Sequence, residues 1–286
     1  MPDAERPAVE PLHLNGLADY HCHCDYSIDA SGSIDDYCRA ALTRGLVELC
    51  FTTHYDANPD SSDGVSFIRI KGIDKPATPE NLAPYVDEVL KAHDKYYPLG
   101  LSVKLGLEFG WYAGCNEAIR ALRERYPFEY MLCGIHELDN ICFCCHDQFE
   151  KCFARFSVEE VADKYAAEVT AAAETGLFDT VAHLDYVRKY GLQYYGPKLD
   201  EQILSRGAGA MFEALKKSGT ALEINTAGMR RPQADYFPRV KLLNLARRAG
   251  VSIRYLGSDA HCPEDVGYDF DAAASLISEH VELCED

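Results

Sequence analysis

Short apolar, β-rich runs alternate with helical stretches along most of the chain, and this alternation constrains its fold more than any other feature. Seven runs are predicted strands, at residues 16–25, 46–54, 102–109, 130–136, 180–184, 220–225 and 251–259. Strands that alternate with helices form parallel sheets through right-handed crossovers. Seven such units favour an α/β fold, a distorted (β/α)7 barrel that is closed or nearly closed. No Gly-rich phosphate loop follows the first strand, so a dinucleotide-binding fold gains no support.

Capping signals mark two of the predicted helices. One begins at Ser33-Ile-Asp-Asp36 and ends at Gly45, and another begins at Ser157-Val-Glu-Glu160 and runs to Gly176. A serine followed three residues later by an acid is typical of a helix start. Further helices are expected at residues 79–97, 116–126, 199–218, 236–250 and 263–283. Residues 1–14 are predicted to form a flexible tail, and residues 15–286 a single barrel domain.

The charge balance excludes some partners. The 286 residues include 28 Lys and Arg against 46 Asp and Glu, a net charge of −18. Such a surface repels nucleic acid and anionic membranes, so neither is an expected partner. It also repels an anionic substrate, unless metal ions and arginines reverse the sign locally. Part of the acidity is then explained by metal ligands that are counted without their metal. The sequence does not indicate an oligomeric state.

The 12 cysteines are expected to be reduced thiols. The first ten residues are polar, and no apolar run reaches membrane-spanning length, which favours a cytoplasmic protein. Cys22 and Cys24 alternate with two histidines along the first strand, so they point to its other face and into the core. Residues 139–156 form a long loop with a cluster that lacks paired C-x-x-C spacing, so a structural zinc knuckle is not expected. Its members are Cys142, Cys144, Cys145, His146 and Cys152.

Six of the ten histidines lie at or just after the carboxyl end of a predicted strand. They are His21, His23, His54, His136, His183 and His261. Glu108 and Asp259 fall in the same layer, and Asp25 and Asp29 follow the first strand. A single strand-end histidine is usually a satisfied polar residue, but the carboxyl ends of a parallel barrel converge on one mouth. Imidazole and carboxylate ligands together suit zinc, manganese or iron, and this set exceeds what one ion needs.

These residues resemble the PHP (polymerase and histidinol phosphatase) family. The resemblance rests on Asp19-Tyr-His21-Cys-His23, Ser27-Ile-Asp29, Thr53-His54, Gly106-Leu-Glu108, His136, His183 and Ser258-Asp259-Ala-His261, in family order. Within the family, the segments 183–188 and 222–230 resemble those of the histidinol-phosphate phosphatases. The loop after His136 departs from the family pattern, and so does the cysteine-rich stretch that follows it.

The resemblance implies two or three divalent ions. The first would be held by His21, His23, Glu108 and Asp259, the second by Glu108, His136 and His183, and the third by Asp29, His54 and His261. Some family members have His in place of Asp29, and Asp25 is a competing candidate. The family mechanism has a metal-bridging hydroxide, held by Glu108 and its neighbours, attack phosphorus. Arg188 and Arg230 would bind the phosphate, since the planar fork of arginine suits phosphoryl oxygens.

The substrate implied by the resemblance is L-histidinol phosphate, in histidine biosynthesis. Its ammonium and imidazole need acceptors, for which the loop acids Asp56, Asp60 and Asp63 are candidates. One alternative is a PHP phosphoesterase that acts on another small phosphate ester or phosphodiester. Another is a PHP module that binds metal without turnover. A metal-dependent amide hydrolase would usually place a bridging lysine at a strand end, and no lysine is placed there.

Overall fold

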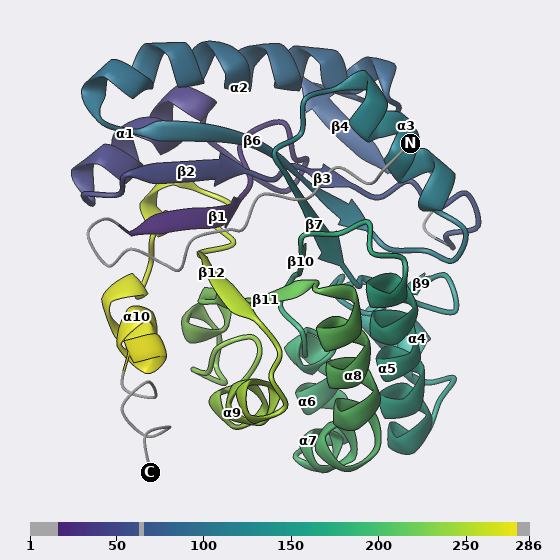
Figure 1. The fold of residues 1–286 in the computed structure, drawn as a ribbon. Helices are drawn as coiled ribbons and strands as arrows, with labels where there is room; N and C mark the ends of the chain where they lie inside the picture. Colours follow the sequence, from purple (N-terminus) through teal and green to yellow (C-terminus); the bar gives the residue numbers. More distant parts are fainter. Residues whose placement is uncertain (1–16, 63–65, 279–286) are drawn as a thin grey trace, which may run out of the picture.

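The protein is a closed barrel of seven parallel strands with helices on its outside (Figure 1). The computed structural model describes residues 17–62 and 66–278, so the predicted tail at 1–14 lies outside the described residues. Around the ring the strands are β2 (Glu48–Phe51), β1 (Ala18–Cys22), β12 (Ile253–Gly257), β11 (Ala221–Asn225), β10 (Thr180–Val181), β7 (Tyr130–Gly134) and β6 (Ser102–Gly110). Pairing of β2 with β6 closes the ring and confirms the predicted (β/α)7 barrel.

The strands differ in length, which distorts the barrel. β6 has nine residues and β10 has two. The predicted strand 46–54 is interrupted after Phe51 and resumes as β3 (His54–Tyr55), which also pairs with β6. In that register His54 lies opposite Glu108. Two predicted metal ligands therefore become neighbours through strand pairing alone.

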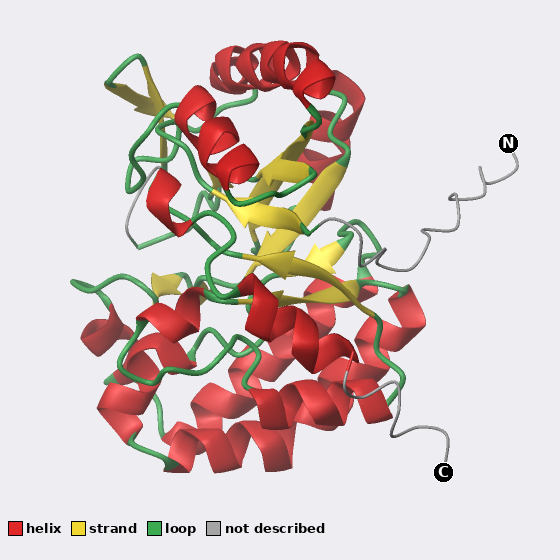
Figure 2. Cartoon of the chain, turned by 90° about the vertical axis from the view of Figure 1, so that its left-hand side faces the viewer, coloured by secondary structure: helices red, strands yellow, loops and turns green. Residues whose placement is uncertain are grey.

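Helices cover the outside of the barrel, and the view in Figure 2 shows the strands between layers of helices. Ser33 and Ser157 each form the predicted capping box, at the starts of α1 and α5. The helices are α1 (Ile34–Thr43), α2 (Ala83–Tyr96), α3 (Asn116–Arg125), α4 (Phe149–Phe153), α5 (Val158–Glu174), α6 (Arg188–Tyr195), α7 (Lys198–Gln202), α8 (Ala208–Ser218), α9 (Val240–Arg248) and α10 (Phe270–Ser278). Within residues 17–62 and 66–278, no helix is long and apolar enough to cross a bilayer.

Some helix boundaries differ from the prediction. The helix expected at 236–250 begins only at Val240, because Phe237 instead exchanges backbone hydrogen bonds with Asn225 at the end of β11. The helix expected at 199–218 consists of α7 and α8, joined by a π-helical turn at Ile203–Gly207. Helices α4 and α6 were not predicted.

Two antiparallel hairpins were not predicted either. They are β4 (Phe67–Ile70) with β5 (Ile73–Pro76), and β8 (Glu137–Leu138) with β9 (Ile141–Cys142). Asp139 and Asn140 connect β8 to β9 with φ angles of 48° and 62°. A two-residue hairpin turn often needs positive φ at both positions, which Asp and Asn tolerate. The β8–β9 hairpin follows His136 directly, so it lies at the carboxyl end of the barrel.

The inside of the barrel is filled near its middle. A small buried cluster is separate from the main core and comes only from strands or the residues that follow them. Its members are Cys50, Tyr130, Leu132 and Ala182, with Tyr20 and Tyr255 packed against them. Because these side chains pack against one another and not against the helices, they lie inside the ring. The barrel is thus a packed core, and its polar groups collect at the carboxyl ends of the strands.

Candidate metal centre

The structure brings all nine predicted metal ligands to the carboxyl end of the barrel. Every strand of the ring except β11 contributes a ligand, either directly or through the segment that follows it. Several groups of three have ligand atoms within 4.8 Å of one another, which is close enough to share an ion. These groups draw on His21, His23, His54, Glu108, His136, His183, Asp259 and His261.

One group consists of His21, His23, Glu108 and Asp259, and its distances are given from Oε2 of Glu108 and Oδ1 of Asp259. Oε2 of Glu108 lies 3.4 Å from Nε2 of His21 and 3.5 Å from Nε2 of His23. Oδ1 of Asp259 is 3.6 Å and 3.4 Å from the same two nitrogens, which are themselves 3.0 Å apart. All four residues are buried. Two imidazole nitrogens and two carboxylate oxygens therefore face one small volume.

The other oxygen of Glu108 faces a second pair of histidines. Oε1 lies 3.1 Å from Nε2 of His183 and 3.3 Å from Nε2 of His136. Nδ1 of His54 is 2.8 Å from Oε2. Burial opposes ionisation of Glu108, but the surrounding histidines hold the pKa of its carboxyl well below the usual value. A fully buried carboxylate that stays ionised and touches several imidazoles is suited to bridge two cations.

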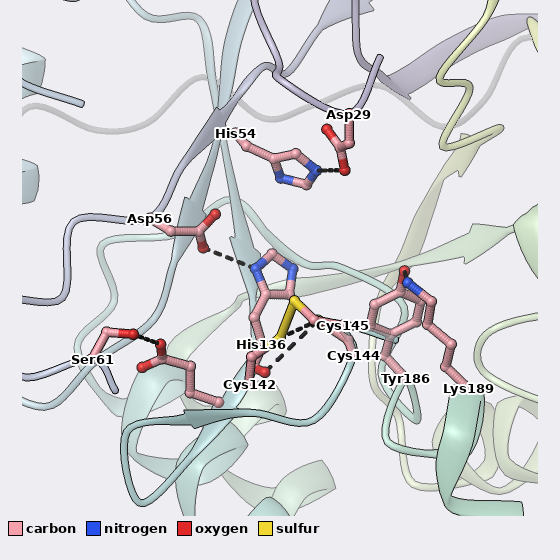
Figure 3. The surroundings of a disulfide bond; sticks show 11 residues. Asp29, His54, Asp56, Ser61, His136, Cys142, Cys144, Cys145, Tyr186 and Lys189 are labelled. Carbon is pink, nitrogen blue, oxygen red and sulfur yellow. Dashed lines mark hydrogen bonds and ion pairs between the residues drawn. A yellow bond between two sulfur atoms is a disulfide. The ribbon is translucent and has the colours of Figure 1, made fainter. Parts of the chain in front are cut away.

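A third group lies nearer to solvent. Oδ2 of Asp29 is 3.4 Å from Nε2 of His261 and 3.8 Å from Nε2 of His54 (Figure 3). The competing candidate, Asp25, is exposed like Asp29, but no ion pair joins it to a histidine among the described residues. Partial burial and the neighbouring Glu88 raise the pKa of Asp25, so its surroundings differ from those of the histidine cluster. The geometry therefore favours Asp29 over Asp25 in this group.

Three of the ligand histidines form a hydrogen bond through Nδ1, the ring nitrogen that faces away from the cluster. This bond leaves the lone pair of Nε2 directed into the cluster. Nδ1 of His21 lies 3.0 and 3.1 Å from the carboxylate of Glu223, and Nδ1 of His136 lies 2.9 Å from Asp56 (Figure 3). Nδ1 of His261 lies 3.0 Å from the backbone oxygen of Asp259. A neutral imidazole that donates from Nδ1 presents a lone pair at Nε2, as in carboxylate–histidine–metal sites.

Few hydrogen bonds join the inward-facing atoms: Nε2 of His183 lies 3.1 Å from Oε1 of Glu108, and Nε2 of His21 lies 3.0 Å from Nε2 of His23. Oε2 of Glu108 is buried and accepts no hydrogen bond, although imidazole nitrogens crowd around it. Burial, together with His54 and His261, lowers the pKa of His23 well below its usual value, so this imidazole is neutral at pH 7. Lone pairs that face one another in a buried space repel unless a cation lies between them. The residues present therefore fit divalent metal ions.

Two orienting carboxylates were missed in the sequence. Glu223 is fully buried and also accepts hydrogen bonds from the backbone N–H of His183, at 3.0 Å, and from the side chain of Asn225, at 2.9 Å. It thereby fixes two ligand-bearing strands relative to each other. For Asp56, the sequence predicts only a contact with the substrate, not an orienting role for a metal ligand. The available signal was the spacing of Glu223 and Asn225 on β11, which places both on one face of the strand.

The backbone is strained or tightly packed at several ligands. His183 and Asp259 have φ angles of 30° and 53°, which are unfavourable for residues other than glycine. Such conformations cost about 1–3 kcal/mol each and persist where the surrounding structure enforces them. A Cβ atom on Gly134 would lie 2.5 Å from the ring of His136, and one on Gly257 would lie 2.7 Å from Cβ of His21. The ligands are thus held by close backbone contact.

A cavity of about 790 Å³ opens onto this cluster. Three cations line it, namely Lys189, Arg230 and Arg231. Arg230 donates to the backbone oxygens of Ser258 and Asp259, at 2.8 and 3.2 Å, and its Nη1 is buried without a hydrogen-bond partner. The cavity therefore holds positive groups beside the acidic ligands, as an anionic substrate requires.

Arg188 lies elsewhere. Its guanidinium is buried and pairs with Asp200 at 2.7 Å, Asp235 at 3.4 Å and Asp185 at 3.5 Å. It is not among the described residues that line the cavity. Arg230 thus lines the cavity beside the ligand cluster, whereas Arg188 is held by carboxylates at the start of α6. Lys189, the next residue, and Arg231 reach the cavity and were not predicted.

The cysteines divide into two kinds. Cys22 and Cys24 are fully buried, which confirms their prediction as core residues. The expectation that all thiols are reduced is wrong for one pair, because Cys142 and Cys145 form a disulfide (Figure 3). These two residues and Cys144 line the same cavity as the metal ligands.

Comparisons with known proteins agree with this geometry. A PHP domain model matches residues 19–227. The chain is 31% identical to the probable histidinol-phosphatase of Deinococcus radiodurans, over 92% of this chain and 94% of that protein. It is 26% identical to the histidinol-phosphatase of Lactococcus lactis, over 91% and 89%. A crystal structure of histidinol phosphate phosphatase from Lactococcus lactis, with zinc, L-histidinol and phosphate, has a TM-score of 0.71 at 23% identity, with 92% and 93% coverage, and supports the fold. The chain belongs to the PHP domain family.

Proposed function

We propose that this chain is a metal-dependent phosphatase that hydrolyses L-histidinol phosphate to L-histidinol and phosphate, in histidine biosynthesis. The observation that carries this proposal is Glu108, a fully buried carboxylate whose two oxygens face five imidazoles. The names of the relatives supply the substrate, since two histidinol-phosphatases match about nine-tenths of the chain.

The ligand groups suggest how the ions are held. His21, His23, Glu108 and Asp259 would hold one ion, and Glu108 with His136 and His183 a second. Asp29, His54 and His261 would hold a third. When bound, divalent cations neutralise phosphoryl oxygens and lower the pKa of water, so that hydroxide is available near pH 7. Glu223 and Asp56 orient His21 and His136 for this task.

Phosphate binding is assigned to the cations of the cavity. Arg230 is fixed by two backbone carbonyls and by an ion pair of its Nε with Asp265, at 3.1 Å, which leaves its Nη1 without a hydrogen-bond partner. Arg231 and Lys189 line the same cavity. Burial lowers the pKa of Lys189, which therefore releases a proton more readily than an exposed lysine. Arg188 contributes by securing α6, which carries Lys189. Because Arg188 pairs with three carboxylates and does not line the described cavity, direct phosphate contact is assigned to Arg230.

The remainder of the cavity suits an amine with an aromatic ring. Asp56 and Glu137 are acidic groups that line it, and Trp111, Tyr186 and Tyr190 are its aromatic lining residues. Carboxylates can accept hydrogen bonds from an ammonium, and an imidazole can stack on an aromatic face. Asp60 is exposed and does not line the described part of the cavity, and Asp63 lies outside the described residues.

The test is phosphate release from L-histidinol phosphate beside a panel of other phosphomonoesters and phosphodiesters. The protein is assayed as purified, after chelation, and after resupply of zinc, manganese or iron. We expect activity to follow metal, with histidinol phosphate preferred by orders of magnitude in kcat/KM. Preference for another ester would remove the substrate assignment and keep the metal chemistry. Absence of turnover with every metal would favour a binding module. We further propose a cytoplasmic location, with neither nucleic acid nor membrane as a partner.

A further inference from the structure

The disulfide between Cys142 and Cys145 lies in the wall of the active cavity and next to a metal ligand. Both cysteines line the cavity, together with the free thiol of Cys144, whose sulfur is 3.5 Å from that of Cys142. Cys142 is buried, whereas the side chain of Cys145 is exposed. Cys145 is therefore the end of the bond that is more open to a reagent from solvent.

The turn closed by this disulfide is attached to His136. The backbone N–H of Phe143 donates to the carbonyl oxygen of His136, at 3.1 Å, and the Cys144 thiol approaches the same oxygen, at 3.8 Å. β8 begins directly after His136, and its first residue, Glu137, pairs with Cys142. The disulfide thus braces the segment that fixes the main chain of a ligand in contact with Glu108.

We propose that Cys142 and Cys145 form a thiol–disulfide exchange site whose redox state controls how firmly His136 is held. The reductant is a dithiol, either a small molecule or a dithiol protein. In the reducing cytoplasm, which is the proposed location, a protein disulfide is usually transient, catalytic or redox-sensing. The exposed residue Cys145 gives a dithiol access to the bond. Of the nine other cysteines described as free thiols, seven are fully buried, and Cys144 and Cys262 are partly exposed. Cys144 lines the cavity beside the disulfide.

The electrons and protons of the exchange pass only between the dithiol and the Cys142–Cys145 disulfide. A thiolate of the dithiol attacks Sγ of Cys145, a mixed disulfide forms, and the bond to Cys142 breaks. Cys142 leaves as a thiolate and takes a proton. The second thiol of the reagent then attacks the mixed disulfide and releases Cys145, so two electrons and two protons pass to the protein. A disulfide of the same class reverses the step.

Reduction is expected to weaken retention of the ion beside His136. Without the cross-link, the turn at 142–145 has more conformational freedom, so its contacts to the His136 carbonyl are less well maintained. Loss of groups that orient a ligand typically reduces metal affinity or activity by about 10–100-fold. Because the brace acts on the main chain and not on the ring, we expect an effect of about tenfold, at the low end of that range.

The full-length, metal-loaded protein is treated with reduced or oxidised dithiothreitol, freed of reagent and resupplied with metal. Thiols are counted after denaturation, metal retention is measured against a competing chelator, and phosphate release is assayed. The matched variants are Cys142→Ser and Cys145→Ser, which cannot form the bond. The control is Cys38→Ala, which removes a buried thiol on α1 outside the cavity.

We expect the oxidised wild type to have two thiols fewer than the reduced form, and to hold metal and turn over about tenfold better. Cys142→Ser and Cys145→Ser should give the same values in both states, while Cys38→Ala responds like the wild type. The activity reading rests on the proposed function, whereas the thiol count and metal retention do not. The proposal fails if the thiol count is the same after reducing and oxidising treatment. It also fails if the oxidised and reduced forms retain metal equally well. An additional zinc ion bound by the reduced form and lost in Cys142→Ser would also overturn it, in favour of a thiolate metal site.

Discussion

The close contact between Gly134 and the metal ligands allows a prediction with a magnitude. In a Gly134→Ala variant the new Cβ would lie 2.5 Å from Cε1 and Nε2 of His136 and 2.8 Å from Oε1 of Glu108. Ordinary contact begins near 3.4 Å, so the ring must move by about 0.9 Å (3.4 − 2.5). A misplacement of about 1 Å can cost roughly 10²-fold in rate, which is about 2.7 kcal/mol of transition-state stabilisation.

The assay for Gly134→Ala is phosphate release with metal in excess, together with metal content and thermal unfolding. We expect kcat/KM to fall about 10²-fold, with weaker binding of one metal ion. The control is Gly207→Ala, whose Cβ would lie 2.7 Å from Cβ of Ala166, in the helical layer. This control should lose stability and keep its metal. A Gly134→Ala variant with wild-type kcat/KM and metal content would refute the placement of His136 against Glu108.

Three further predictions concern groups around the cluster. Replacing Glu223 with Gln removes the acceptor charge behind His21, and metal affinity measured by chelator competition should fall about 10–100-fold; an unchanged affinity would contradict its orienting role. Replacing Arg231 with Gln should raise KM for the phosphate ester about tenfold at unchanged metal content, as expected for a lost charge-assisted hydrogen bond. Burial raises the pKa of Asp185 to about 7, despite Arg188, so the folded state binds its proton more tightly than the unfolded state. The stability that this group contributes is therefore complete below about pH 4 and declines as the pH rises to 7. Relative to Asp185→Asn, the wild type should lose on the order of 4 kcal/mol across this range in urea titrations, and a pH-independent difference would refute the shift.

Strand placement was predictable because it depends on local sequence. The seven apolar runs, the capping boxes at Ser33 and Ser157, and the position of each histidine at a strand end are all local signals, and the barrel follows from their alternation. Because strand ends converge in any parallel barrel, the ligand set could be named before its geometry was known. The placement of Asp29 and not Asp25 in the third group depends on how the loop after β1 folds, which the sequence left open.

The features that the sequence did not reveal depend on contacts between distant segments. Glu223 is recognisable as an orienting group only when β11 and β1 lie on either side of β12 and the carboxylate of Glu223 meets His21. The pairing of Arg188 with Asp200 and Asp235 joins separate segments of the chain, so the motif around Arg188 does not reveal it. The disulfide depends on how the turn after β9 folds, which no helix or strand pattern specifies. The interruption of the second strand after Phe51 was likewise hidden, because residues 46–54 read as one apolar run.

Closure of the ring has a consequence for how the protein is made. β1 lies between β2 and β12, so this strand acquires its second neighbour only when residues 253–257 have been synthesised. His21 and His23 are synthesised early, whereas Asp259 and His261 follow β12. The group of His21, His23, Glu108 and Asp259 therefore cannot assemble on an emerging chain before β12 has joined the ring, although Glu108, His136 and His183 are all present earlier. Uptake of the ion that Asp259 would hold is thus tied to closure of the barrel.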